Sequence, residues 1–310
     1  MLRITDISGI EVGHATHPVE NTGCTAVLCK DGAVAGVDIR GSAPGTRETE
    51  LLKPTRLIRE IHGIMLSGGS AFGLRTADGA MQYLSEHGIG YNARGNLIPI
   101  IPAAIIFDLG PDRDMAFPSV AMGYEACKNA SVDFDEGLIG AGKGAGIGKI
   151  FGREQAMAGG IASAAIELGN GARVGALAVV NALGDIIDPE NGSIIAGART
   201  KDKQDFADTY QSLLAFSGPT LDSGKGMNTT LAVVATDAKF NKEEINKIAQ
   251  MAQNGISRST RPAHTMHDGD VVFALSTSDK QADINIVGEA AAYMVSAAII
   301  RAVKIANNLP

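Results

Sequence analysis

Asn228-Thr229-Thr230, followed directly by the apolar run Leu231-Ala-Val-Val-Ala-Thr236, is the most informative stretch of this chain. Uninterrupted apolar and β-branched residues predict a core strand that is buried on both faces. The hydroxyl residue Thr229 stands at the first position of this strand, directly after the small-residue tract Ser223-Gly-Lys-Gly-Met-Asn228. The pattern therefore predicts a flexible segment that leads into a rigid strand.

Cleavage between Asn228 and Thr229 would expose a threonine that carries a hydroxyl nucleophile and a free α-amine on one residue. The unperturbed pKa of an α-amine is about 7.7 to 8.0, so a useful fraction is unprotonated at neutral pH and can act as a base. Thr229 would then supply both nucleophile and base. An ordinary loop that enters a strand has the same residues, so these positions alone leave both interpretations open.

The composition favours a peptide or another small molecule as substrate. The chain has 310 residues, of which 45% are hydrophobic and 38 are glycine, enough for one large core or two fused lobes. Its formal net charge is −7, and no run of Lys and Arg is long enough to suggest a nucleic-acid surface. We therefore expect no nucleic-acid partner.

The cysteines and the first residues predict a cytoplasmic protein. The cysteines are Cys24, Cys29 and Cys127. Their odd number and the lack of a Cys-x-x-Cys motif argue against a disulfide framework or a zinc ribbon. Residues 1–8 show no basic segment followed by an apolar one, so no signal peptide is expected. Prolines or charged residues interrupt the apolar stretches 97–109 and 287–306, so we expect no membrane span.

Strands and helices are predicted to interleave without a regular βαβ period. Strands are expected over 24–28, 33–37, 98–107, 175–180, 231–236 and 271–276, and helices over 70–87, 154–168, 241–254 and 287–306. Asn241 and Glu244 have capping-box spacing, and Gly255 is expected to end that helix. This order favours a layered α/β sandwich over a Rossmann sheet or a (β/α)8 barrel.

Residues 1–310 are predicted to form a single domain, because no internal repeat or low-complexity tail is visible. The Ser/Gly-rich segment Phe216 to Gly226 is the one plausible break. Since it closely precedes Thr229, we interpret it as a processing loop within the domain.

Asp268-Gly269-Asp270 opens the strand predicted over 271–276. Residues two apart in an extended chain point to the same face, so both carboxylates would face one site. Such a pair can orient a hydroxyl nucleophile and hold an ammonium, while mutual repulsion raises one of the two pKa values. Asp-Gly is also a common turn dipeptide, which leaves a simple turn as the alternative.

Asn181 ends the strand predicted over 175–180, where an amide group can donate to a developing oxyanion. An Asx turn is the alternative.

The glycine ladder Gly140 to Lys149 has no Gly-x-Gly-x-x-Gly spacing, and no Ser or Thr follows Lys149, so a nucleotide site is not expected. Alternate glycines instead allow close approach of a strand or a substrate.

Gly68-Gly69-Ser70 precedes the helix predicted over 70–87, so its amides are expected to form an anion-binding N-terminus with Ser70 as the N-cap. The segment lacks the second glycine of a hydrolase nucleophile elbow.

His264 and His267 have a spacing that metal ligands use, but no third ligand group stands out. We expect neither a metal nor another cofactor.

Five sequence blocks occur in the order typical of one enzyme family. They are Gly68-Gly-Ser-Ala-Phe-Gly-Leu74, Gly140-Ala-Gly-Lys-Gly-Ala-Gly-Ile-Gly-Lys149, Val179-Val-Asn181, Asn228-Thr-Thr230 and His264-Thr-Met-His-Asp-Gly-Asp270. Together they resemble the L-aminopeptidase/D-esterase family of self-processing amide hydrolases, which includes β-peptidyl aminopeptidases and 6-aminohexanoate (nylon) oligomer hydrolases.

The resemblance implies an αββα four-layer sandwich, similar in layering but not in strand order to N-terminal-nucleophile hydrolases. It implies self-cleavage into an α fragment of residues 1–228 and a β fragment of residues 229–310. It also implies a homo-oligomer, a tetramer of αβ units.

The resemblance also implies roles for individual residues. Thr229 is the expected nucleophile, Asp268 and Asp270 are expected to orient it, and Asn181 is expected to stabilise the oxyanion. Lys149 matches a lysine near the nucleophile, where a cation could act, and a surface lysine is the alternative. We further expect Gly68, Gly69 and Ser70 to line the substrate and oxyanion region. The two aspartates match the nylon-oligomer hydrolases, whereas β-peptidyl aminopeptidases have a Ser-x-Glu arrangement and a serine nucleophile.

The predicted function is therefore a self-processing amidohydrolase that cleaves peptides or linear oligoamides through an acyl-enzyme. One alternative is an exo-acting aminopeptidase, which needs an acidic pocket for the substrate ammonium. An acyltransferase similar to ornithine acetyltransferases, or a binding protein without catalysis, is the alternative of another class.

Overall fold

The computed structural model describes residues 2–110, 117–218 and 228–310. The processing loop predicted over 216–226 falls largely on residues 219–227, which lie outside this description. The small-residue tract before Asn228 lies outside it as well.

A large mixed sheet organises the described residues, with strand order β10-β11-β14-β16-β2-β4-β7-β3 and β1 paired to β2. Its strands are β1 (Glu11–Thr16), β2 (Gly23–Ile39), β3 (Thr46–Arg47), β4 (Glu60–Ser67), β7 (Ala103–Ile105), β10 (Gly160–Glu167), β11 (Arg173–Asn181), β14 (Thr229–Ala238) and β16 (Val271–Lys280). The predicted mixed α/β class is confirmed.

Strand β2 changes partners along its length. Residues 23–28 pair with β1 and β4, whereas residues 34–39 pair with β16, and a register shift separates the two parts. The two strands predicted over 24–28 and 33–37 are thus one long strand. It links the half of the sheet that carries β14 and β16 to the half that carries β4 and β7.

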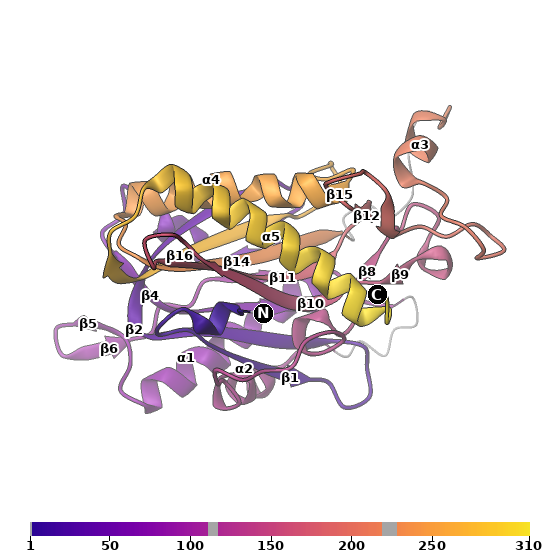
Figure 1. The fold of residues 1–310 in the computed structure, drawn as a ribbon. Coiled ribbons are helices and arrows are strands. Elements are labelled where there is room, and N and C mark those ends of the chain that lie inside the picture. Colours follow the sequence, from indigo (N-terminus) through magenta and orange to yellow (C-terminus); the bar gives the residue numbers. More distant parts are fainter. Residues whose placement is uncertain (1, 111–116, 219–227) are drawn as a thin grey trace.

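Helices cover both outer faces of the sheet (Figure 1). On one side lie α4 (Lys242–Ser259) and α5 (Ile284–Ala306), and on the other lie α1 (Thr76–Glu86) and α2 (Val120–Lys128). A hydrophobic cluster joins α4 and α5 to β10, β11, β14 and β16, and another joins α1 and α2 to β2 and β4. A third cluster fills the space between the two halves of the sheet.

The remaining elements are short. The smaller sheets are β5 (Tyr91–Ala93) with β6 (Asn96–Ile98), β8 (Gly146–Ile147) with β9 (Met157–Ala158), and β12 (Asp185–Ile187) with β13 (Ile194–Ala196) and β15 (Thr260–Arg261). The helices are η1 (Ile4–Asp6), η2 (Thr49–Leu52), η3 (Ser70–Arg75), η4 (Gly140–Gly142), η5 (Arg153–Gln155) and α3 (Thr209–Leu214). In Figure 1, α3 projects from the body of the molecule near the end at which β14 begins.

Side-chain alternation along β14 fixes where Thr229 points. Leu231 and Val233 belong to the cluster between the two halves of the sheet, whereas Ala232 and Val234 belong to the cluster under α4 and α5. Successive side chains of a strand alternate between faces. The side chain of Thr229, two residues before Leu231, therefore points to the inner space between the two halves.

Several sequence predictions need correction. The helix predicted over 154–168 is wrong, because residues 160–167 form β10. The alanines of this segment have high helix propensity, but they pair with β11 and pack beneath α5, and this tertiary context decides. The strand predicted over 98–107 shrinks to β7, since Pro99 and Pro102 cannot donate to a ladder. The helix predicted over 70–87 begins with the 3-10 helix η3.

The helix α4 confirms the predicted capping box of Asn241 and Glu244 but continues to Ser259. Gly255 does not end it. A Cβ atom at Gly255 would lie 2.2 Å from the carbonyl oxygen of Ala292 on α5. The glycine therefore serves the close approach of α4 to α5.

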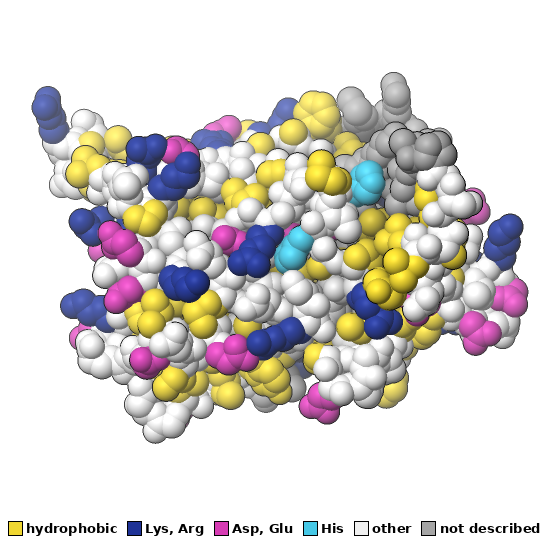
Figure 2. Space-filling model, turned by 90° about the horizontal axis from the view of Figure 1, so that it is seen from above, with side chains coloured by type: hydrophobic (Ala, Val, Ile, Leu, Met, Phe, Trp, Pro, Cys, Tyr) yellow, Lys and Arg dark blue, Asp and Glu magenta, His cyan; other side chains and the backbone are white. Residues whose placement is uncertain are grey.

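By length and mean hydropathy, α5 passes the criterion for a membrane span, although its charged residues led us to expect none. Its most apolar 18-residue window is 61% buried inside the protein. Such burial is typical of a core helix. Seen from the side of α4 and α5, basic and acidic side chains are interspersed among exposed apolar ones (Figure 2).

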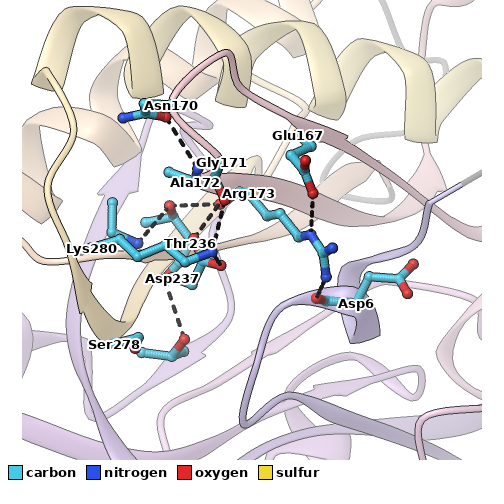
Figure 3. Close-up of polar contacts among 12 residues, drawn as sticks. Asp6, Glu167, Asn170, Gly171, Ala172, Arg173, Thr236, Asp237, Ser278 and Lys280 are labelled. Carbon is cyan, nitrogen blue, oxygen red and sulfur yellow. Dashed lines mark hydrogen bonds and ion pairs between the residues drawn. The ribbon is translucent and has the colours of Figure 1, made fainter.

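A polar network stabilises the ends of β11 and β14 that are farthest from Thr229 (Figure 3). The buried carboxylate of Asp237 accepts the backbone N–H of Arg173 at 2.7 Å and the Nζ of Lys280 at 2.9 Å. The hydroxyl of Thr236 donates to the carbonyl of Arg173 at 2.8 Å. Since β11 pairs with β14 in one continuous register, this network helps to fix which residue lies opposite Thr229.

We expect Asp237→Ala to lower the free energy of unfolding by about 1–3 kcal/mol, because the buried N–H of Arg173 loses its acceptor. The exposed Asp279 on β16 provides the control variant Asp279→Ala. Denaturant unfolding of both variants measures the difference. A loss of stability that is equal in the two variants would contradict the role of Asp237.

Candidate active site

The peptide bond between Asn228 and Thr229 lies at the start of β14, and both residues are buried, with 1% and 3% of their surface exposed. The carbonyl oxygen of Asn228 accepts the hydroxyl of Thr229 at 2.5 Å and the backbone N–H of Gly269 at 2.8 Å. The carbonyl of the predicted cleavage site is thus held between the predicted nucleophile and a backbone donor.

Asn181, the predicted oxyanion residue, lies directly opposite Thr229 in the antiparallel pairing of β11 with β14. Its Oδ1 accepts Lys149 Nζ at 2.8 Å and the N–H of Gly146 at 3.1 Å. Its Nδ2 donates to the carbonyl of Phe107 at 3.3 Å. The structure therefore brings Asn181 and Lys149 close to the peptide bond between Asn228 and Thr229.

Lys149 is only 5% exposed, and its Nζ also donates to the backbone carbonyl of Asn181 at 3.0 Å. Burial and the nearby charge of Arg153 hold the pKa of this amine well below its usual value, while Asp268 and Asp108 oppose the shift. The resemblance implied a cation at this position. Burial works against this charge, because it disfavours the protonated form of the amine.

Both aspartates of the Asp-Gly-Asp segment are buried, and both bind backbone donors. Asp270 Oδ1 accepts the N–H of Thr230 at 2.7 Å, and its Oδ2 accepts Nδ1 of His264 at 2.8 Å. Asp268 Oδ2 accepts the N–H and the hydroxyl of Thr265 at 2.8 and 2.6 Å. Among the described contacts, no hydrogen bond joins either carboxylate to the hydroxyl of Thr229.

Burial and the charge of Asp270 raise the pKa of Asp268, so the mutual repulsion predicted for this pair is present. A parallel β-bridge between the backbones of Asn228 and Asp268 places Gly269 beside Thr229. The Asp270 carboxylate thus binds the backbone of β14 directly, whereas the Asp268 carboxylate fixes the adjoining segment through Thr265.

The segment Gly68-Gly69-Ser70 does not form the predicted anion site, because its amides are already bound within the chain. Gly68 donates to Gly23 at 2.9 Å, Gly69 to Asp108 Oδ1 at 2.7 Å and Ser70 to Ile106 at 3.0 Å. Ser70 is also not an N-cap. Gly69 caps η3, and Ser70, its first residue, has a positive φ of 53°.

Sequence reasoning missed Asp108. Its carboxyl group is buried, and this burial raises its pKa. A Cβ atom at Gly68 would lie 2.0 Å from Asp108 Oδ2, so the glycine makes room for the acid. Asp108 directly follows Phe107, whose carbonyl binds Asn181, and an acidic residue that closes an apolar run was the available signal.

His264 was considered only as a metal ligand. In the structure, its Nδ1 and backbone N–H bind Asp270, and its Nε2 lies 3.1 Å from the hydroxyl of Ser257 on α4. The positive φ of 57° at His264 lets both groups reach the same carboxylate oxygen. His264 thus links α4 to the strand end that precedes β16.

The sequence profile of peptidase family S58 matches residues 3–310. The chain belongs to peptidase family S58. An uncharacterised aminopeptidase of Mycobacterium leprae is 40% identical over 297 residues, which cover 91% of this chain and 80% of the relative. A 6-aminohexanoate-oligomer endohydrolase of Paenarthrobacter ureafaciens is 28% identical over 286 residues, which cover 90% of this chain and 76% of the relative.

The solved structure of the L-aminopeptidase D-Ala-esterase/amidase of Ochrobactrum anthropi matches with a TM-score of 0.72 and 20% identity, over 97% of this chain and 85% of that chain. That enzyme is described as a new variant among the Ntn hydrolase fold. The S58 chain shares this fold, and the predicted family resemblance is confirmed. Its family and its relatives make it a hydrolase that acts on amide bonds.

A buried lysine with a lowered pKa takes up a proton on unfolding, so the free energy of unfolding rises with pH between its folded and unfolded pKa values. One such proton contributes a slope of about 1.4 kcal/mol per pH unit. We therefore expect Lys149→Met to flatten the stability curve in the pH range just below the unfolded pKa of lysine, about 10.4, measured by denaturant unfolding. The half-buried Lys143, on the same loop, provides the control Lys143→Met. Equal slopes in wild type and Lys149→Met would contradict a lowered pKa of Lys149.

Proposed function

We propose that this S58 hydrolase cleaves itself between Asn228 and Thr229 and then uses Thr229 as an N-terminal nucleophile. The observation that carries the proposal is the 2.5 Å contact of the Thr229 hydroxyl with the carbonyl oxygen of Asn228 at the start of a buried strand. The products would be an α fragment of residues 1–228 and a β fragment of residues 229–310. The helix, strand and cluster order supports a four-layer αββα architecture.

In the self-cleavage step, the hydroxyl oxygen of Thr229 bonds to the carbonyl carbon of Asn228, and the hydroxyl proton passes to the neutral amine of Lys149. The C–N bond then breaks, and the nitrogen of Thr229 takes the proton back. This N-to-O acyl shift leaves an ester, which water hydrolyses to the carboxylate of Asn228 and a free N-terminal threonine. The lowered pKa of Lys149, bound to the residue opposite Thr229, supports this assignment.

In the processed enzyme, the free amine of Thr229 takes the hydroxyl proton, and the hydroxyl attacks the substrate amide. Asn181, opposite Thr229, is assigned to the oxyanion of this step. Asp268 and Asp270 hold the strand end through Thr265, His264 and Thr230. Water then releases the acyl group, which separates this reaction from acyl transfer.

Asp108 favours action on substrates with a free N-terminal amine. An exo-acting aminopeptidase needs an acid near the nucleophile to bind the substrate ammonium, and Asp108 adjoins Asn181 through Phe107. The relative from Mycobacterium leprae, named an aminopeptidase, also supports this substrate class. The endohydrolase from Paenarthrobacter ureafaciens supports the alternative, cleavage within linear oligoamides. We further propose a cytoplasmic homo-oligomer, a tetramer of αβ units.

Thr229→Ala should remain a single chain, because it lacks the attacking oxygen, whereas wild type should yield two fragments in intact-mass analysis. Thr230→Ala is the matched control, since Thr230 is equally buried and adjacent. Its fragments should have the same boundary as those of wild type, apart from the substituted residue. A single uncleaved chain in active wild-type enzyme, or a β fragment that begins at Thr230, would contradict the assignment.

Asp108→Asn should raise KM for aminoacyl anilides by about tenfold or more, because a hydrogen bond to a charged group contributes about 1.5–3 kcal/mol. Steady-state kinetics with aminoacyl anilides and with N-acetylated 6-aminohexanoate oligomers measure this. Wild type should not cleave the acetylated oligomers. Their cleavage at internal bonds, with an unchanged KM for anilides in Asp108→Asn, would favour the endohydrolase.

A further inference from the structure

We propose that the backbone N–H of Gly269 is the oxyanion donor of the self-cleavage step. This inference rests on the proposed function and names the group that stabilises its transition state. When the Thr229 oxygen bonds to the carbonyl carbon of Asn228, the π electrons of the carbonyl move to its oxygen. The negative charge forms 2.8 Å from the nitrogen of Gly269. It disappears again when the C–N bond breaks.

The geometry of this contact meets the requirement for an oxyanion donor. Such donors lie about 2.7–3.1 Å from the oxygen that becomes charged, in a site that excludes water. Asn228 and Thr229 are almost fully buried, so the field of a single N–H is stronger here than in water. In the uncleaved chain, the Nδ2 of Asn181 donates to the carbonyl of Phe107. The Gly269 amide already donates to the carbonyl of Asn228 before the reaction begins.

The neighbours of Gly269 hold its amide in place before the reaction begins. On one side, Asp268 binds Thr265 through its carboxylate and accepts the N–H of Ala43 at its carbonyl, at 2.9 Å. On the other side, Asp270 binds His264 and the N–H of Thr230. Asp268 and Asp270 are positioning residues in this step, because they fix the peptide that donates.

Position 269 also requires a glycine. A Cβ atom there would lie 2.8 Å from the hydroxyl oxygen of Thr229 and 2.6 Å from the carbonyl oxygen of Ala43. Any larger residue would push either the nucleophile or the segment before β16 out of place. The missing side chain lets the nucleophile and the donor amide approach the same carbonyl.

An amide-to-ester substitution tests the donor without adding an atom. Glycolic acid, introduced at position 269 by nonsense suppression, replaces the N–H with an oxygen. The rate of self-cleavage, followed by the appearance of the two fragments, should fall by about 10²- to 10³-fold. The matched control is the same substitution at Gly137, whose N–H donates to Ile161 at 2.7 Å. We expect that control to cleave at close to the wild-type rate.

The variant Gly269→Ala distinguishes the effect of the donor N–H from the effect of the space that a glycine leaves. It keeps the N–H but introduces the Cβ atom, and Gly169→Ala is its control, because a Cβ at Gly169 would meet nothing within 4 Å. We expect Gly269→Ala to slow cleavage as well. If Gly269→Ala cleaves slowly but the ester at position 269 cleaves at close to the wild-type rate, the donor role is overturned. The glycine would then serve only to leave space beside the Thr229 hydroxyl. Wild type that never cleaves would overturn the proposed function itself.

Discussion

The parallel pairing of β14 with β16 is the constraint on which the site depends. Parallel neighbours need a crossover connection, and α4 supplies it between the two strands. The crossover brings Asn228 and Asp268 side by side, although forty positions separate them in the chain. The capping box at Asn241 and the close packing of α4 on α5 therefore contribute to the geometry of the proposed cleavage site.

The site is a buried set of polar groups that depend on one another. Lys149 is bound to Asn181, which faces Thr229, and Asp270 binds both Thr230 and His264. In a low-dielectric interior such groups are costly unless they are paired. The pairing explains how a lysine and two aspartates can lie beneath a core strand without being exposed to water.

The sequence predicted the structure correctly where a short local pattern encodes it. The apolar runs of β14 and β16 and the capping box of α4 were predicted because short segments encode them. The helix expected over 154–168 failed because alanines that favour a helix are held in β10 by β11 and α5. His264 was considered only as a metal ligand, because its hydrogen bond to Asp270 depends on the folded structure. A backbone donor such as Gly269 leaves no mark in a sequence except the absence of a side chain.

The burial of the Asn228–Thr229 bond has an electrostatic consequence for maturation. The proposed self-cleavage would replace one neutral peptide group with a carboxylate and an amine that can be protonated, at residues with 1% and 3% exposure. An isolated buried charge is unfavourable by several kcal/mol or more. Under the proposed self-cleavage, the new carboxylate would therefore have to pair with a buried donor or move toward solvent.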